Sequence, residues 1–290
     1  MKHNQYYVAK ANPANFERKM VAIIALLCAG VLIYLGLMGP MYKGEIVYRT
    51  HPTINNQLIA QDAVNTFLMA PLLIVAAWAL LAKKGFARYL LAIAPLFLFY
   101  YAISYALGWE WKAADYYGNS ENWFFHYIIV LMSALIFLLY SFRLFPTKAR
   151  YHFKKNQLII YSVLCSIFLA LFAMMWSREV FELWREGTTR GYEFAPTAFW
   201  LVRTIDLGVC VPLGLVSIYL LWIDPAKSYA LQMLFFGFFI SMSVVVNAMA
   251  LVMFLKNDPS YEHGSTIVFI ILMLIVFFGY AFVLKGYRAK

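Results

Sequence analysis

The stretch that decides the fold class runs from Ser265 to Leu284 and reads STIVFIILMLIVFFGYAFVL. It contains twenty residues, and none of them is charged. A helix of about 20 apolar residues is long enough to cross the roughly 30 Å hydrocarbon core of a bilayer. A helix on the surface of a soluble core would alternate apolar and polar faces, and this stretch does not. We therefore interpret it as a transmembrane helix.

Seven further apolar blocks of similar length precede it. They fall at approximately 20–39, 62–82, 87–107, 123–142, 157–176, 201–223 and 229–254. Of the 290 residues, 63% are hydrophobic and 13% are charged, and the mean hydropathy is +0.70. A soluble domain has about half apolar and a quarter charged residues. The sequence predicts an all-α integral membrane protein with about eight transmembrane helices.

The basic residues predict an orientation. With the N-terminus inside, the inner segments hold sixteen Lys and Arg and the outer loops seven, with Arg203 at a helix entrance. Lys and Arg accumulate in cytoplasmic loops, so we expect both termini in the cytoplasm and the chain in a bacterial inner membrane. The predicted parts are a cytoplasmic segment 1–19, a four-helix half 20–145, a basic linker 146–156, a second four-helix half 157–284 and a cytoplasmic tail 285–290.

The two halves show a weak internal repeat. In each, a span is followed by an outer loop and then by a span that opens with polar residues and contains a proline, Pro71 or Pro212. Aligning these prolines matches Asp62 with Arg203 and Asn65 with Asp206. Because each half has an even number of spans, the sequence predicts two parallel repeats, related by an axis along the membrane normal.

Polar residues inside the spans are the candidates for a site, because an ionisable group in hydrocarbon is costly unless paired or hydrated. Arg203 and Asp206 are three residues apart, which places them on one helical face at salt-bridge distance. They form either a structural pair within the helix or, with Asp62, a polar cluster between the halves. Other polar groups at the same level are Asn65, His126, Tyr101, Tyr105 and Asn247. We expect a pocket that opens to the extracytoplasmic side.

Several functional classes are disfavoured by what the sequence lacks. The net charge of +10 resides at the ends of apolar blocks, where it sets topology, so no nucleic-acid partner is predicted. There is no H-E-x-x-H or G-x-S-x-G motif, and His126 is the single histidine placed in a span. The cysteines Cys28, Cys165 and Cys210 are scattered among the apolar blocks. We predict no cofactor and no metal.

Parts of the sequence resemble a family. The run from Gln61-Asp62 to Pro71-Leu72-Leu73, the Lys83-Lys84-Gly85 turn, the Tyr-rich run 100–108 and the run from Arg203 to Gly208 and on to Pro212 are similar to a group of uncharacterised bacterial multi-pass membrane proteins. The resemblance covers roughly blocks two to four and six to seven. It implies a multi-pass architecture and a bacterial inner membrane, and it implies no activity.

Three functions fit these features. The first is a transporter or channel-like protein for a small solute or lipid, with Asp62, Arg203 and Asp206 as gate or binding group. The second is a sensor or assembly module that binds a protein partner or a second copy through its loops. The third is a lipid-modifying enzyme that uses His126 and an aspartate as acid and base. In all three the lipid bilayer is the surrounding solvent.

Labelling of introduced cysteines tests the predicted orientation. In intact cells, a membrane-impermeant thiol reagent should label the Asp115→Cys variant, whose new thiol lies in an outer loop. The same reagent should leave the thiol of the Arg150→Cys variant, in the basic linker, unlabelled. Labelling at position 150 in intact cells would show that the orientation is reversed.

Overall fold

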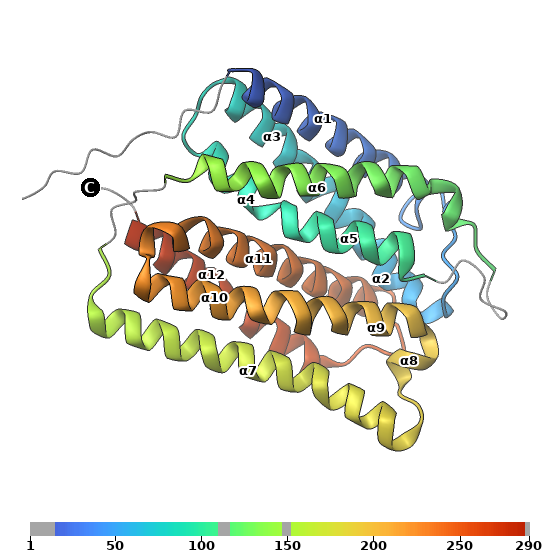
Figure 1. Cartoon of the computed structure of the whole chain (residues 1–290). Helices are drawn as coiled ribbons and strands as arrows, with labels where there is room; N and C mark the ends of the chain where they lie inside the picture. The colour runs from blue at the N-terminus through green and yellow to red at the C-terminus, as the bar shows by residue number, and fades with distance from the viewer. Residues whose placement is uncertain (1–14, 110–116, 147–151, 288–290) are drawn as a thin grey trace, which may run out of the picture.

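The computed structural model describes residues 15–109, 117–146 and 152–287, and eight helices in these ranges are long and apolar enough to span a membrane (Figure 1). This confirms the predicted helical membrane architecture. The elements are α1 (Asn15–Met38), η1 (Pro52–Ile54), α2 (Asn55–Val64), η2 (Asn65–Met69), α3 (Ala70–Leu81), α4 (Ala87–Ile93), α5 (Pro95–Leu107), η3 (Ser120–Trp123), α6 (Phe124–Leu144), α7 (Lys155–Glu186), α8 (Arg190–Phe194), α9 (Pro196–Ile205), η4 (Asp206–Cys210), α10 (Val211–Ile223), α11 (Pro225–Leu255) and α12 (His263–Tyr287).

Two helices extend beyond the apolar blocks that predicted them. The first block begins at about residue 20, whereas α1 begins at Asn15 and so includes part of the segment predicted to be cytoplasmic. The fifth span was expected to end near 176, but α7 continues to Glu186 and ends at Gly187, whose φ of 77° suits a glycine after a helix. The predicted outer-loop residues Glu179 and Glu182 therefore lie on a helix. Residues 1–14 of the predicted segment 1–19 and residues 147–151 of the predicted linker 146–156 lie outside the described residues.

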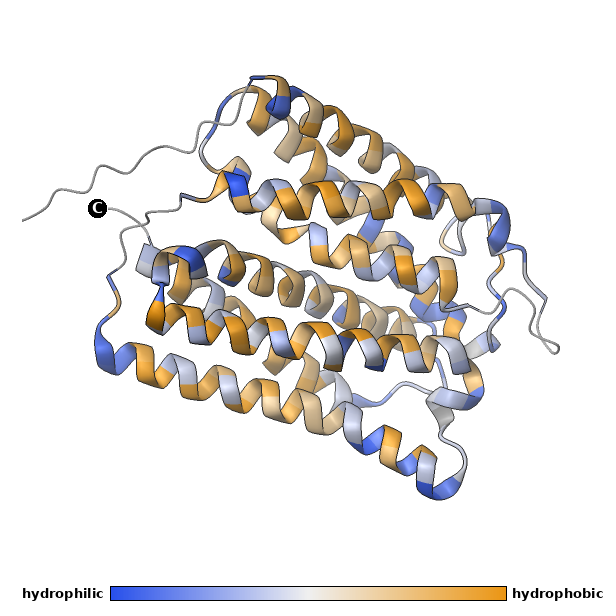
Figure 2. Ribbon diagram, viewed as in Figure 1, coloured by the Kyte–Doolittle hydropathy of each residue, from blue (hydrophilic) through white to orange (hydrophobic). Residues whose placement is uncertain are grey.

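The helices form two groups of four spans (Figure 1). The first contains α1, α2 to α3, α4 to α5, and α6, and the second contains α7, α9 to α10, α11, and α12. The groups meet where α11 packs against α2, α4 and α5, and where α5 packs against α9. Hydrophobic residues cover the middle of the bundle and hydrophilic ones gather at its ends (Figure 2). This distribution fits a bilayer around the helices.

The two ends of the bundle carry opposite charges. We call one the acidic end, which holds Glu45, Glu121, Glu193 and Asp258, and the other the basic end, which holds Lys83, Arg143, Lys155 and Lys285. Polar contacts join segments at each end. At the acidic end, Asn56 Nδ2 donates to Asp258 Oδ2 at 2.6 Å. At the basic end, the backbone N–H of His152 donates to the Gly286 carbonyl at 2.9 Å.

Small residues let the two groups approach closely. A Cβ added to Gly237 of α11 would lie 2.4 Å from the Ala92 carbonyl oxygen and 2.8 Å from Ile93 Cα. One turn further, the Ser241 hydroxyl donates to the Ile93 carbonyl at 3.2 Å, beside the break before Pro95. Helices in a membrane associate through such close packing and through polar contacts, since lipid offers no hydrophobic driving force.

The second and sixth spans are interrupted in the same way. Each contains a π-helical turn, η2 or η4, that begins six residues before the proline. The wide hydrogen bonds run from Ala70 N–H to the Asn65 carbonyl and from Val211 N–H to the Asp206 carbonyl. The prolines cannot donate to the preceding turn, so a wider turn is tolerated there. The positions agree with the alignment of Pro71 with Pro212, while the parallel repeat itself stays a prediction.

Adding a methyl group to Gly237 tests the close approach between the groups. Gly237→Ala should lower the free energy of unfolding by about 1–3 kcal/mol, because backbone atoms of α4 would have to shift. The matched control is Gly30→Ala on α1, where an added Cβ meets no atom within 4 Å. That variant should be neutral or more stable by up to about 1 kcal/mol. Equal thermal stability of the two variants in detergent would contradict the packing described here.

Candidate functional site

Asp62 is a buried carboxylate near the acidic end of the second span. It lies in α2, one turn before η2, and its residue surface is 1% exposed. Its Oδ2 atom accepts a hydrogen bond from the Met41 N–H at 3.3 Å. A Cβ at Gly39 would fall 2.2 Å from the same oxygen, so the glycine lets the chain pass close to this carboxylate in its present position. The loop therefore covers Asp62.

Four buried tyrosines lie near this carboxylate. We call them the tyrosine cluster: Tyr48, Tyr101, Tyr105 and Tyr127. The Tyr48 and Tyr127 hydroxyls are 2.8 Å apart, and the ring centroids of Tyr101 and Tyr105 are 4.5 Å apart. Tyr48 comes from the covering loop, Tyr101 and Tyr105 from α5, and Tyr127 from α6. The cluster thus joins three segments around Asp62.

The Tyr48 phenol is a neutral hydrogen-bonding group. Burial raises its pKa well above the ordinary value, and the other tyrosines and Asp62 raise the pKa further. Both effects disfavour the phenolate, because a second negative charge in a buried place is costly. Tyr48 therefore presents an O–H group and a ring to the cluster.

Several polar atoms of the second and third spans are buried without a hydrogen-bond partner among the described residues. They are Asn65 Nδ2, Thr66 Oγ1, Tyr101 Oη and Ser104 Oγ. Asn65 uses its other amide atom, since its Oδ1 accepts from Gln61 Nε2 at 3.1 Å. Nearly all buried polar groups in proteins are hydrogen-bonded, and those that lack a protein partner usually bind water or a ligand. The Asn65 side chain and the Tyr101 hydroxyl are neighbours, so a water or a polar ligand that bonds to both would be stabilised beside the cluster.

Arg203 does not join Asp62, which corrects the expected cluster between the halves. Its guanidinium pairs with Glu179 of α7, and Nη1 also donates to the Phe199 carbonyl at 3.2 Å. The guanidinium lies 3.7 Å from the Phe199 ring centroid and 4.6 Å from that of Trp176. The reason is the extra length of α7, which brings Glu179 beside α9. The sequence placed that acid in a loop.

Asp206 is a second buried acid, separate from the first. It starts η4, is 4% exposed, and lies beside Cys210, Trp176 and Tyr100. The expected salt bridge to Arg203 is not formed, since among the described residues the ion pair of Arg203 is with Glu179. Thus the consecutive tyrosines of α5 face different acids: Tyr101 faces Asp62 and Tyr100 faces Asp206.

Two predicted site residues lie elsewhere. His126 stacks on Tyr34 of α1 with 5.0 Å between ring centroids, and its Nδ1 is buried without a described partner. Asn247 joins α11 to α12, because its Nδ2 donates to the Phe269 carbonyl at 3.2 Å. These contacts of both residues are helix-packing contacts, and neither joins His126 to an aspartate, as a lipid-modifying enzyme would require.

Sequence reasoning missed the contribution of the loops. Tyr48 lies in a loop between spans, where a tyrosine is expected at the membrane surface. The loop is fixed to the segment before α6: Arg49 makes two hydrogen bonds with Glu121, at 2.9 and 3.2 Å, and Asn119 Oδ1 accepts from the Val47 N–H at 2.9 Å. Nothing in the sequence indicates that Tyr48 and Arg49 lie opposite Asn119 and Glu121, so this contact could not be predicted without the fold.

Among the described residues no group of three or more His, Cys, Asp or Glu could hold a metal ion. The three cysteines are free and lie on different helices. Comparisons with models of protein families, with curated proteins and with solved structures find no match for this chain. The resemblance to the bacterial membrane proteins described above thus stays a prediction, and the candidate site is argued from its own chemistry.

A double-mutant cycle tests the pairing of Arg203. Arg203→Ala combined with Glu179→Ala should show a coupling of about 0.5–3 kcal/mol in the free energy of unfolding, near the lower bound because Glu179 is partly exposed. The comparison cycle of Arg203→Ala with Asp206→Ala should give a smaller coupling. Thermal unfolding in detergent measures both. Additive effects in the first cycle, with coupling in the second, would restore the pairing predicted from sequence.

Proposed function

We propose that this chain is a transporter or channel-like protein for a small cationic solute, bound by Asp62 within the tyrosine cluster. One observation carries the proposal: Asp62 is 1% exposed in a membrane-spanning helix and has no ion pair among the described residues. An ionisable residue held at such depth is a functional hypothesis by default. The proposal includes a bacterial inner membrane with both termini in the cytoplasm, which rests on the distribution of Lys and Arg.

The charges near the site favour a cation. Arg203, the basic residue expected to neutralise Asp62, pairs with Glu179. Asp62 and Asp206 are left without a salt bridge among the described residues, so an ionised carboxylate at either position would have no ion-pair partner there. Removing one partner of a buried pair typically costs about 3–5 kcal/mol, and a bound cation would supply the missing partner. A proton is the smallest cation that can do so.

The aromatic rings favour an ammonium-type cation. Electron-rich ring faces attract cations within about 6 Å, and cages of aromatic rings are a common solution for binding alkylammonium groups. Tyr48, Tyr101, Tyr105 and Tyr127 lie around Asp62, and the Trp109 ring centroid is 6.0 Å from that of Tyr105. The Asn65, Thr66 and Ser104 atoms that lack a partner among the described residues could form hydrogen bonds with other parts of the solute.

Access to this site requires the covering loop to move. The tyrosine rings pack against one another, and the loop of residues 39–54 supplies both Tyr48 and the Met41 N–H that donates to Asp62. The ion pair between Arg49 and Glu121 helps to hold this loop closed. The Arg49 side chain is 16% exposed and the Glu121 side chain is 37% exposed. Opening the loop would break this ion pair and the Val47–Asn119 bonds and would expose Ile46 and Tyr48, so the binding energy of the solute has to offset that cost. In this proposal the loop is the gate on the acidic side.

Binding of test cations to the purified chain tests the proposal. Ammonium, choline, tetramethylammonium and sodium chlorides are titrated at constant ionic strength while thermal unfolding is followed in detergent. At 100 times its dissociation constant, a ligand that binds the folded state adds about 2.7 kcal/mol to stability. We expect an ammonium-type cation to raise the melting temperature of the native chain and to leave that of Asp62→Asn unchanged.

The matched control is Asp206→Asn, which makes the same change in the sixth span. It should keep the cation-dependent shift, because Tyr100 and not the tyrosine cluster faces Asp206. Uptake of the stabilising cation is then measured in proteoliposomes. Vesicles that contain the native chain should take up the cation, and vesicles that contain the Asp62→Asn variant should not. A shift that survives in Asp62→Asn, or no shift with any cation, would reject the proposed binding site.

A further inference from the structure

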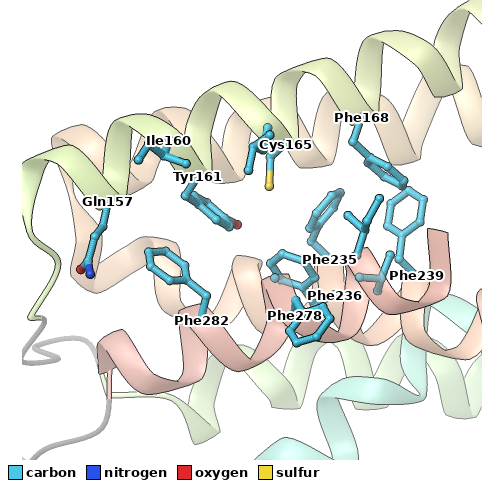
Figure 3. A pocket seen from close by; sticks show the side chains of 14 residues that line it. Gln157, Ile160, Tyr161, Cys165, Phe168, Phe235, Phe236, Phe239, Phe278 and Phe282 are labelled. Carbon is cyan, nitrogen blue, oxygen red and sulfur yellow. The ribbon is translucent and has the colours of Figure 1, made fainter. Parts of the chain in front are cut away.

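A cleft opens on the side of the second helix group, away from Asp62. It lies between α7 and α12 with α11 as its floor, and its volume is about 380 Å³ (Figure 3). Aromatic rings from all three helices line it: Phe168, Phe235, Phe236, Phe239, Phe278 and Phe282. In the first group, by contrast, α1 and α6 pack directly against each other. The second group therefore presents a lateral opening.

The body of the cleft suits hydrocarbon and not a polar solute. Its most polar interior group is the Tyr161 hydroxyl, which already donates to Gln232 Oε1 at 2.6 Å. The Gln232 amide in turn donates to the Ser217 carbonyl at 2.9 Å. These polar groups satisfy one another, and the walls are left with ring faces and aliphatic carbons. Figure 3 shows Phe235 and Phe236 at the border of the cleft, where their rings pack against Gly214 of α10 and Gly279 of α12.

The cleft extends from the basic end to about the middle of the membrane. Gln157, near the start of α7, lines it at one end, and Phe168 and Phe239, near the middle of their helices, line it at the other. Both helices that flank it face the surroundings: only 11% of the spanning window is buried in α7, and 11% in α12, against 44% in α1. The cleft is thus open to one leaflet.

Basic side chains lie at the mouth of the cleft. Lys154 and Lys155 precede Gln157 by less than one turn, and Lys285 follows Phe282 by one turn at the end of α12. Packing of Phe153 against Gly286 and Tyr287 brings these two helix ends together. All three lysines are exposed, and none makes an ion pair with a described residue. The mouth therefore carries uncompensated positive charge.

We propose that this cleft binds an anionic phospholipid, with an acyl chain among the phenylalanine rings and the headgroup phosphate at Lys154, Lys155 and Lys285. An apolar body with a basic mouth at the membrane surface matches the two parts of such a lipid. The uncompensated lysines at the mouth favour a lipid with a phosphate over an apolar partner helix, which would bring no negative charge to them. The proposal is independent of cation binding at Asp62.

Native mass spectrometry of the detergent-purified chain tests this proposal. The full chain is titrated with dioleoylphosphatidylglycerol and, separately, with dioleoylphosphatidylcholine. We expect one phosphatidylglycerol molecule to bind in preference to phosphatidylcholine. Combined Lys154→Gln, Lys155→Gln and Lys285→Gln substitution should weaken phosphatidylglycerol binding about tenfold or more. The matched control, Lys83→Gln with Lys84→Gln at the same end of the bundle, should retain the preference.

A cleft-filling variant tests the acyl-chain part separately. Leu164→Trp fills the cleft, since Leu164 lines it and is 60% exposed, and it should abolish the preferred lipid adduct. The neighbouring Val163, 51% exposed and not in the lining, gives the control Val163→Trp, which should bind lipid as the native chain does. Equal binding of the two lipids by native chain would overturn the proposal. The proposal would also be overturned if the native chain were a dimer and the Leu164→Trp variant a monomer, because a second copy of the chain would then occupy the cleft.

Discussion

The backbone of this chain has no water to bond with across the hydrocarbon core, and this constraint shapes the rest of the structure. Each spanning segment must satisfy its own N–H and C=O groups, so each becomes a helix. Where a proline breaks that pattern, another group has to compensate. In the second and sixth spans the helix widens into η2 and η4, and before Pro95 the Ser241 hydroxyl reaches the Ile93 carbonyl.

The two buried acids lie in or next to these π-helical turns. Asn65 and Asp206 each begin a π-helical turn, and Asp62 lies one turn before the first. A wide turn redirects the side chains that flank it, and such turns occur frequently at functional sites. Here they direct polar groups toward α5, whose tandem tyrosines face the two acids. As a result, the polar residues within the spanning helices gather beside α5, which lies where the two helix groups pack against each other.

The two proposed binding regions differ in chemistry because their surroundings differ. Near the acidic end, a loop closes over a carboxylate and phenol rings, which suits a small cation. Near the basic end, the separation of α7 from α12 leaves an apolar cleft that faces the lipid, and lysines stand at its mouth. The closely packed interface around Gly237 lies between them, so each region can be altered by substitution with little effect on the other.

By itself, the sequence determined the fold class. Uninterrupted apolar blocks such as Ser265 to Leu284 leave no alternative to eight spanning helices, and the buried Asp62, Asn65, Tyr101 and Tyr105 were found because polar residues in such blocks are rare. Only the tertiary structure decided which polar groups meet. The partner of Arg203 is Glu179, from a helix longer than its apolar block, and Tyr48 reaches Asp62 from a loop. Sequence periodicity describes one helix at a time, whereas these contacts depend on how separate segments pack.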